Sequence, residues 1–154
     1  GIPAKKKKLP LFIAGGGDVD KVRSLVQKEG AQDVHLTGRL DHREAIEAIN
    51  RAAFLCVPSR SEGSPLVVYE ALAMGKPVVV PQANIGNFLQ NGRDALIMNK
   101  GDAVSILEAL KVLWRDSSLA ARLGDNGRRF AEEHFREDII IDKLMSFYRD
   151  VVSC

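Results

Sequence analysis

Apolar residues in the first hundred positions form short runs that alternate with amphipathic stretches. The runs are LPLFIAG (9–15), VHLTG (34–38), FLCVPS (54–59), PVVVP (77–81) and ALIM (95–98). Each is bounded by Gly, Pro, Ser or charged residues, which predicts five short strands. Because the runs are mostly apolar without strict alternation, we expect both faces of the sheet to be covered.

The stretches between these runs have helical periodicity. The apolar positions that share a helix face are Val22, Leu25 and Val26 in the first stretch, and Ala45, Ile46 and Ile49 in the second. Asp41 followed by Glu44 predicts a capping box at the start of the second helix. Strand and helix recur at intervals of about twenty residues, typical of right-handed crossovers between parallel strands. The pattern predicts a doubly wound, Rossmann-like α/β fold, with a parallel sheet sandwiched by helices.

After residue 100 the pattern predicts only helices. Apolar positions at helical spacing are Ile106, Leu107, Leu110, Leu113 and Trp114, then Leu119, Leu123 and Phe130, then Ile141, Leu144, Met145, Tyr148, Val151 and Val152. We expect these three helices to pack on the outer edge of the sheet. Trp114 lies on the apolar stripe of the first, which favours a core residue over a ligand-binding one.

Length and composition limit the class of protein. The 154 residues, 45% hydrophobic and 27% charged, fit one soluble domain covering 1–154. The net charge of +2 argues against a nucleic-acid partner, and the lysine run at 5–8 indicates a solvated lead-in to the first strand. No apolar run reaches the ~18–20 residues that span a bilayer. Cys56 in an apolar run and Cys154 at the end favour a reducing compartment, so we expect a cytoplasmic location.

The stretch SRSEGSPLVVYE (59–70) contains two glutamates around an apolar segment. Ser64 is a good N-cap, Pro65 a good first helical residue and Gly75 a good stop, so we predict a helix over 65–74. It follows a predicted strand, and its N-terminus therefore opens at the carboxyl edge of a parallel sheet. Open α/β folds bind ligands at this edge.

A helix start at this edge suits a phosphate. The N–H groups of Leu66 and Val67 have no acceptor within the helix, and the positive end of the helix dipole adds to them. Glu70 lies about 7.5 Å further along the axis and is placed to accept hydrogen bonds from a ribose diol. Glu62, in the preceding loop, could accept from a second polyhydroxylated group. A phosphate between two such groups describes a nucleotide sugar.

Spacing alone leaves other interpretations of the two glutamates open. A glycosidase pair would face each other across a scissile bond, whereas here one glutamate is in a loop and the other inside a helix. A metal site would need more His, Asp or Cys than this stretch contains. In the purely structural alternative, Glu62 caps the loop and Glu70 is a buried acid with its hydrogen bonds satisfied.

The segment PSRSEGSPLVVYEALAMGKPVV resembles the motif of the retaining, sugar-nucleotide-dependent glycosyltransferases of the GT-B fold, family 4 type. The motif has two glutamates separated by seven residues, then EALAMGKPVV. The segments LFIAGGGD, VHLTGR, FLCVPS and NGRDALIM follow the family order, so the resemblance covers nearly the whole chain.

The resemblance implies the C-terminal, donor-binding half of a two-domain hexosyltransferase, with a nucleotide sugar as substrate and no obligatory metal or other cofactor. Glu62 would contact the transferred sugar, as the candidate catalytic residue, and Glu70 the nucleotide ribose. The backbone at Leu66 and Val67 would hold the diphosphate. The remaining donor-site positions implied are Gly63, Ser64, Pro65 and, near the base, Arg39.

The chain also departs from the family. The first strand–loop–helix unit, with the Arg and Lys that neutralise the diphosphate, has no counterpart here, and neither has the N-terminal acceptor-binding domain. Gly63-Ser64-Pro65 replaces a frequent Gly-Phe-Gly. The chain therefore resembles a fragment or half-enzyme, and we expect it to be inactive alone. A membrane contact is expected only through a lipid acceptor or the missing half, which would make the enzyme peripheral to the membrane.

Two other functions stay open. One is a non-catalytic module that binds nucleotide sugars or a partner domain, and the other is a nucleotide-sugar epimerase of the same fold. The glycines of IAGGGDVD lack the third Gly of a dinucleotide fingerprint, which favours a tight turn with Asp18 as N-cap over a phosphate site.

Overall fold

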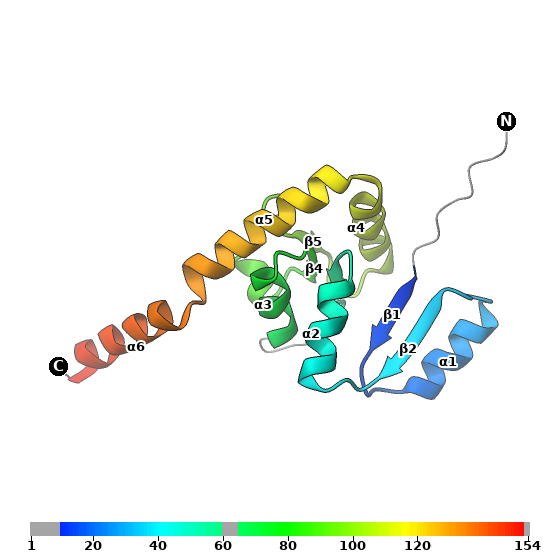
Figure 1. The fold of residues 1–154 in the computed structure, drawn as a ribbon, viewed down its shortest axis with the longest axis horizontal. Helices are drawn as coiled ribbons and strands as arrows, with labels where there is room; N and C mark the ends of the chain where they lie inside the picture. Colours follow the sequence, from blue (N-terminus) through cyan, green and yellow to red (C-terminus); the bar gives the residue numbers. More distant parts are fainter. Residues whose placement is uncertain (1–9, 60–64, 153–154) are drawn as a thin grey trace. The chain divides into compact units, whose positions relative to one another are not determined.

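The computed structural model describes residues 10–59 and 65–152. Its elements, drawn in Figure 1, are β1 (Leu11–Ala14), α1 (Val19–Lys28), β2 (Val34–Gly38), α2 (His42–Arg51), β3 (Leu55–Cys56), α3 (Leu66–Ala73), β4 (Val78–Pro81), the 3-10 turn η1 (Asn84–Asn87), β5 (Leu96–Met98), α4 (Ala103–Arg115), α5 (Ser117–His134) and α6 (Glu137–Val152). The five predicted strands and the predicted helices are confirmed.

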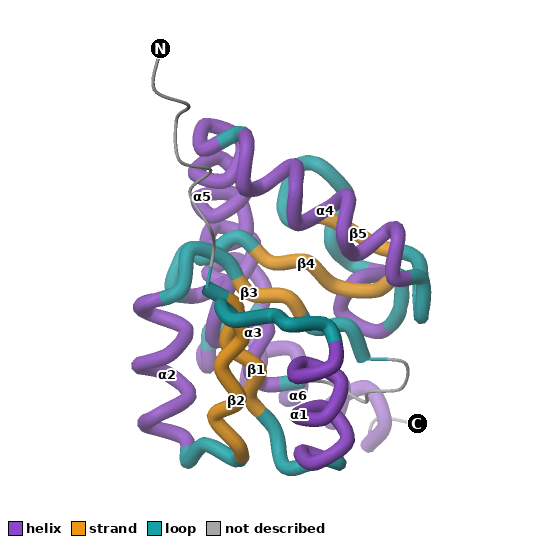
Figure 2. Tube along the Cα trace, turned by 90° about the vertical axis from the view of Figure 1, so that its right-hand side faces the viewer, coloured by secondary structure: helices purple, strands orange, loops and turns teal. Residues whose placement is uncertain are grey.

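All strand pairs among the described residues are parallel. β1 pairs with β2, and a second sheet has the order β3–β4–β5. Figure 2 shows the strands in orange. The sequence predicted parallel strands joined by helices, and this is what the structure has. Contacts within the chain divide it into two compact units, residues 1–45 and 46–154.

The first unit contains β1, α1 and β2. The glycine-rich turn after β1 is closed by the Gly15 N–H, which donates to the Gly38 carbonyl at 2.8 Å. Asp18 caps α1 by accepting from the Lys21 amide at 3.1 Å, which confirms the predicted N-cap. Helix α1 packs against β2 in this unit, and Leu11 and Phe12 of β1 are 49% and 62% exposed. Two strands and one helix supply too few elements to bury them.

The second unit has helices on both faces of its sheet. The β4 residues Val78, Val79 and Val80 are at most 1% exposed. Val78 and Val80 pack in one core cluster with residues of α3, whereas Val79 packs in another with Leu113 of α4. Successive residues of a strand point to opposite faces, so the two clusters lie on the two sides of β4. The predicted sandwich is confirmed here.

Helix α2 is fixed at both ends by side chains. The Asp41 carboxylate accepts from the Glu44 amide, and the Glu44 carboxylate accepts from the Asp41 amide, both at 2.8 Å. This confirms the predicted capping box. At the other end, the Lys76 ammonium donates to the carbonyls of Asn50 and Ala52 at 2.6 and 3.1 Å. A positive charge at a helix C-terminus interacts favourably with the negative end of the helix dipole.

The prediction that Trp114 is a core residue is wrong, since it is 40% exposed. The stripe of α4 that packs against the core consists of Ile106, Ala109, Leu110 and Leu113. Trp114 and Leu107 lie roughly 80–100° around the helix from Ile106, at the margin of that stripe. The apolar face predicted from the sequence was wider than the face that the sheet covers.

The predicted packing of α6 on the sheet is also wrong. Its large apolar side chains are exposed, including Leu144 at 49% and Tyr148 at 55%. The sheet faces of this unit are already covered by α3, α4 and α5, so α6 has no remaining apolar surface on it. No helix in the described part of the chain is long and apolar enough to cross a membrane.

Candidate functional site

Helix α3 begins one residue later than predicted. Its first helical residue is Leu66, and Pro65 is the N-cap, with extended backbone angles of −70° and 107° and no side-chain cap bond. Pro65 is therefore not the first helical residue. The carbonyl of Pro65 accepts from the Val68 amide at 2.9 Å, which closes the first turn. The predicted cap Ser64 lies outside the described residues.

The other end of α3 is closed as predicted at Gly75. This glycine has a φ of +68°, a conformation that disfavours other residues. Its amide donates to the Leu72 carbonyl at 2.9 Å, and the Lys76 amide donates to the Ala71 carbonyl at 2.8 Å. The two bonds form a Schellman motif, which turns the chain directly into β4.

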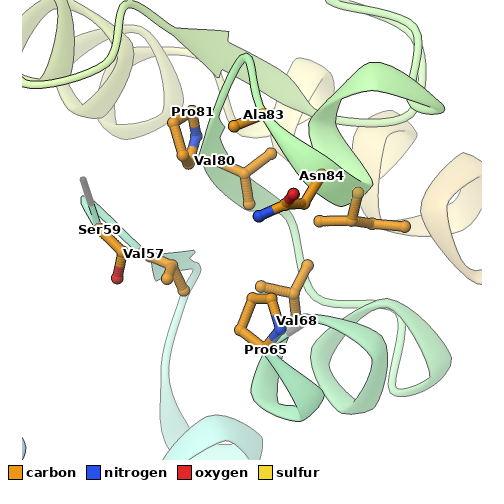
Figure 3. A pocket seen from close by; sticks show the side chains of 9 residues that line it. Val57, Ser59, Pro65, Val68, Val80, Pro81, Ala83 and Asn84 are labelled. Carbon is orange, nitrogen blue, oxygen red and sulfur yellow. The ribbon is translucent and has the colours of Figure 1, made fainter. Parts of the chain in front are cut away.

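A small pocket lies at the carboxyl edge of the three-stranded sheet, beside the start of α3 (Figure 3). Val57 and Ser59, which follow β3, line one side of it. Pro65, the N-cap of α3, and Val68 in its first turn form another part of the wall. The remaining lining residues come from the end of β4 and the turn after it: Val80, Pro81, Ala83, Asn84 and Ile85. The first turn of α3 thus opens where parallel α/β sheets bind ligands.

The exposed side of α3 is the side that bears Glu70. Leu66 is 73% exposed and Glu70 is half-buried, whereas Val68 and Leu72 are fully buried. Residues four apart lie on the same helix face, so Glu70 stands one turn behind the Leu66 amide. The N–H groups of Leu66 and Val67 have no acceptor within the helix, as in any first turn. A ligand at this end could contact both the amides and the carboxylate.

Asn84 is a site residue that the sequence reasoning missed. It follows β4, lines the pocket, and has a φ of +50°, the only positive φ of a non-glycine residue among those described. Asn tolerates this conformation better than most residues. Figure 3 shows its side chain across the pocket from Ser59. The signal was the predicted strand 77–81, since the residues after it must reach the same sheet edge as those after β3.

Gly86 holds the turn of Asn84 against β4. A Cβ at this position would lie 2.1 Å from the carbonyl oxygen of Pro81, so no side chain fits without a shift of the backbone. The Gly86 amide also donates to the Ala83 carbonyl at 2.9 Å. These contacts fix the wall of the pocket opposite α3.

The remaining predicted site residues lie either outside the described residues or in the other compact unit. Glu62 and Gly63 lie outside the described residues, with Ser64. Arg39 is exposed, follows β2, and lies beside Gly16, where an added Cβ would be 3.7 Å from the Cβ of Arg39. Arg39 belongs to the first compact unit and α3 to the second.

The residues described do not gather the usual ligands of a metal. No group of three or more His, Cys, Asp or Glu side chains that could hold an ion occurs among them. Cys56, a free cysteine on β3, is half-buried, and burial raises the pKa of its thiol from 9.0 to about 11. The thiol is therefore protonated at neutral pH, which argues against a nucleophilic role.

The family of this chain follows from residues 2–116, which match the family described as Glycosyl transferases group 1. The chain belongs to this family. The group 1 domain is 28% identical over 131 residues to the uncharacterized glycosyltransferase MJ1178 of Methanocaldococcus jannaschii, covering 84% of this chain and 37% of that protein. It is 27% identical over 150 residues to the O-antigen chain mannosyltransferase C of Escherichia coli, covering 94% and 40%. The chain thus spans about two fifths of the length of these relatives.

Solved structures of glycosyltransferases share the fold. Sucrose-phosphate synthase from Thermosynechococcus elongatus superposes with a TM-score of 0.80 at 27% identity, over 94% of this chain and 39% of that one. Anabaena Alr3699/HepE in complex with UDP and glucose superposes with a TM-score of 0.78 at 18% identity, over 90% and 40%. The structural neighbours are GT-B glycosyltransferases, so the predicted fold class is confirmed.

Proposed function

We propose that residues 1–154 are the donor-binding half of a retaining, family 4 type glycosyltransferase, which transfers a hexosyl group from a nucleotide sugar to an acceptor. The observation that carries this proposal is the position of α3. Its first turn opens beside the pocket at the carboxyl edge of the sheet, and Glu70 lies one turn further on the exposed side.

In this proposal a different group of the protein binds each part of the donor. The amides of Leu66 and Val67, at the positive end of the helix dipole, bind the diphosphate. Glu70 lies about 6 Å along the axis from Leu66 and accepts hydrogen bonds from the ribose hydroxyls.

The loop before α3 contacts the transferred sugar through Glu62, the proposed catalytic residue. Gly63, Ser64 and Pro65 bring the backbone of this loop close to the donor. Arg39 contacts the base.

The donor class is supported by what similar proteins bind or transfer. The Alr3699/HepE structure contains UDP and glucose, and the E. coli relative is a mannosyltransferase. For this chain we infer a nucleotide sugar as substrate, without an obligatory metal or other cofactor. Stabilising the charge on the departing diphosphate is then a task of the α3 N-terminus.

The acceptor site belongs, in this proposal, to an N-terminal domain outside residues 1–154. The relatives are long enough for one, because about three fifths of their length has no match here. The enzyme would work in the cytoplasm and meet the membrane only through a lipid acceptor or that other half. Holding the acceptor against the donor supplies about 7–11 kcal/mol of barrier reduction. Residues 1–154 alone should therefore bind nucleotide weakly and show no measurable transfer.

Calorimetry with UDP, GDP and ADP and their glucose or mannose conjugates tests the roles of the two glutamates. Glu70→Ala should weaken the free nucleotide and the nucleotide sugar alike, by about 1–3 kcal/mol for a lost charge-assisted hydrogen bond. Glu62→Ala should weaken only the nucleotide sugar. Glu133→Ala, an exposed glutamate on α5, is the matched control and should change neither.

Several outcomes would contradict the proposal. Equal losses for both ligands in both glutamate variants would refute the separate roles. Transfer by residues 1–154 without a further domain would show that the active site is misplaced. Conversion of the donor sugar by the whole polypeptide without any acceptor, detected by mass analysis, would indicate an epimerase. Binding without transfer by the whole polypeptide would indicate a non-catalytic module.

A further inference from the structure

A second cavity lies between α5 and the segment 88–94, which leads into the start of β5. Its volume is about 320 Å³, within the ~300–1,000 Å³ that is typical of small-molecule sites. Because the strands are parallel, the start of β5 and the carboxyl edge with the α3 pocket lie at opposite ends of the strands. The two cavities share no lining residue among those described. The second cavity is therefore separate from the proposed donor site.

Hydrogen bonds join the two walls of this cavity. The Asn126 side chain on α5 donates from Nδ2 to the Arg93 carbonyl at 2.8 Å, and its Oδ1 accepts from the Arg129 guanidinium at 2.8 Å. The segment 88–94 is also closed on itself, since the amides of Arg93 and Asp94 both donate to the Gln90 carbonyl, at 3.1 and 3.0 Å. Walls that are fixed before binding lose little freedom when a ligand arrives, which favours affinity.

The cavity is lined by charges of both signs. The Arg129 guanidinium donates to two uncharged oxygens, one of a side-chain amide and one of the backbone. None of the ion pairs in the described part of the chain joins it to Glu133, four residues further along the same helix face. Asp94 is 4% exposed and its Oδ1 lies 3.4 Å from the Nε of Arg93. A free anion would be repelled by the two carboxylates and a free cation by the two guanidiniums, so an uncharged ligand is favoured.

The uncharged ligand that fits this lining has hydroxyl groups and apolar ring faces. Guanidiniums only donate hydrogen bonds and carboxylates only accept them, whereas a hydroxyl does both. The Nδ1 of His134 lies 2.9 Å from the Phe130 carbonyl, which can only accept, so in the neutral ring Nε2 is a further acceptor. Phe88 is 73% exposed and Phe130 is half-buried, and both line the cavity. Such aromatic side chains supply the apolar surface on which the C–H face of a sugar ring can pack.

We infer that this cavity binds a neutral saccharide of one or two rings. The inference goes beyond the proposed donor site, because it requires no nucleotide and involves none of the residues around α3. In a glycosyltransferase such a site would hold the carbohydrate part of an acceptor or product on the enzyme and raise its effective concentration there.

Hydrogen exchange followed by mass spectrometry tests the inference on the natural polypeptide that contains this chain. The ligands are methyl α-mannoside, N-acetylglucosamine and maltose, each at saturating concentration and without nucleotide. We expect at least one of them to slow exchange in residues 88–94 and 126–134 by roughly three-fold or more.

Three exposed side chains provide the variants for this assay. Phe88→Ala removes the apolar wall and Arg129→Gln removes a charged donor, and each should abolish the protection. Arg128→Gln is the matched control, because the neighbouring Arg128 pairs with Glu132 and does not line the cavity. This variant should keep the protection of the wild type.

Three results would overturn the inference. The first is unchanged exchange of both segments with every saccharide, and the second is protection that survives in both Phe88→Ala and Arg129→Gln. In the third, inorganic phosphate or spermidine protects the two segments and no saccharide does, which means that the cavity takes a charged ligand.

The saccharide assay and the donor assay fail independently. Glu70→Ala should weaken nucleotide binding and leave the protection of 88–94 by saccharide unchanged. Glu133→Ala should do the reverse. Saccharide protection without any nucleotide binding would refute the proposed function and leave this inference intact, whereas nucleotide binding that depends on Glu70, without saccharide protection, would refute only the inference.

Discussion

Replacing Gly124 by alanine tests how closely α5 must approach α3. Gly124 lies in the first half of α5, facing the turn that ends α3. A Cβ added there would lie 2.2 Å from the carbonyl oxygen of Gly75 and 3.6 Å from the Cδ atom of Pro77. The oxygen belongs to the backbone of a Schellman turn with Gly75 at a φ of +68°, so it cannot move without disturbing that turn.

Two effects of opposite sign compete in Gly124→Ala. Alanine is better than glycine in a helix interior by about 1 kcal/mol, which would stabilise the protein. Overpacking of a filled interior costs about 1–3 kcal/mol, and more where backbone must move. A contact of 2.2 Å is far inside any ordinary separation, so the steric cost should prevail. We expect a net loss of about 1–2 kcal/mol in the free energy of unfolding.

Urea denaturation of residues 1–154, monitored through the fluorescence of Trp114, measures the loss in the free energy of unfolding. Trp114 reports on the same compact unit that contains Gly124. Gly127→Ala is one control, because its nearest contact is a side-chain atom, Cδ2 of Leu72 at 2.7 Å, and the nearest backbone oxygen, that of Asp94, is at 3.1 Å; its loss should be smaller. Ser118→Ala, at an exposed position of the same helix, should have little effect. Unchanged or increased stability of Gly124→Ala would refute the close approach of α5 to Gly75.

Two further predictions concern the scaffold around the site. Lys76→Met keeps the aliphatic stem but removes the hydrogen bonds to the Asn50 and Ala52 carbonyls. We expect the free energy of unfolding, measured by heat or urea, to fall by about 1–2 kcal/mol. The control Lys111→Met, which removes only a surface ion pair, should lower it by no more than about 0.5 kcal/mol. Burial raises the pKa of the Cys56 thiol from 9.0 to about 11, so the folded state favours the neutral thiol. The resulting contribution to the free energy of unfolding is fully present below pH 9 and is lost as the pH rises from 9 to 11. The stability difference between the wild type and Cys56→Ala should therefore decrease from pH 8 to pH 10.5, and a constant difference would argue against this burial.

The parts of the fold that could be predicted are those decided by local chemistry. The capping box of Asp41 and Glu44 and the N-cap Asp18 need only residues within one helical turn. Gly75 could be predicted as a helix stop because few other residues adopt its conformation. The same local rules identified α3, and with it the segment on which the proposed site depends.

The wrong predictions concern which surfaces meet. Trp114 and Tyr148 are at positions with helical apolar spacing, yet both are exposed. Periodicity shows that a face is apolar but not whether the chain contains a surface to cover it. Asn84 was missed for a related reason, because its role depends on the turn after β4 reaching the same sheet edge as Ser59.

The position of the proposed diphosphate site depends on glycines that lie outside it. Gly124 admits the turn at Gly75, and Gly127 admits Leu72 in the last turn of α3, so these two glycines let α5 pack closely against the C-terminal end of α3. The first turn of α3, where Val68 is fully buried in the core, faces the pocket. A rigid helix transmits a displacement at one end to the other, about 12 Å away over eight residues. A shift of about 1 Å at a binding site is enough to cost a large factor in function. The approach of α5 to Gly75 should therefore contribute both to the stability of this unit and to the orientation of the Leu66 and Val67 amides.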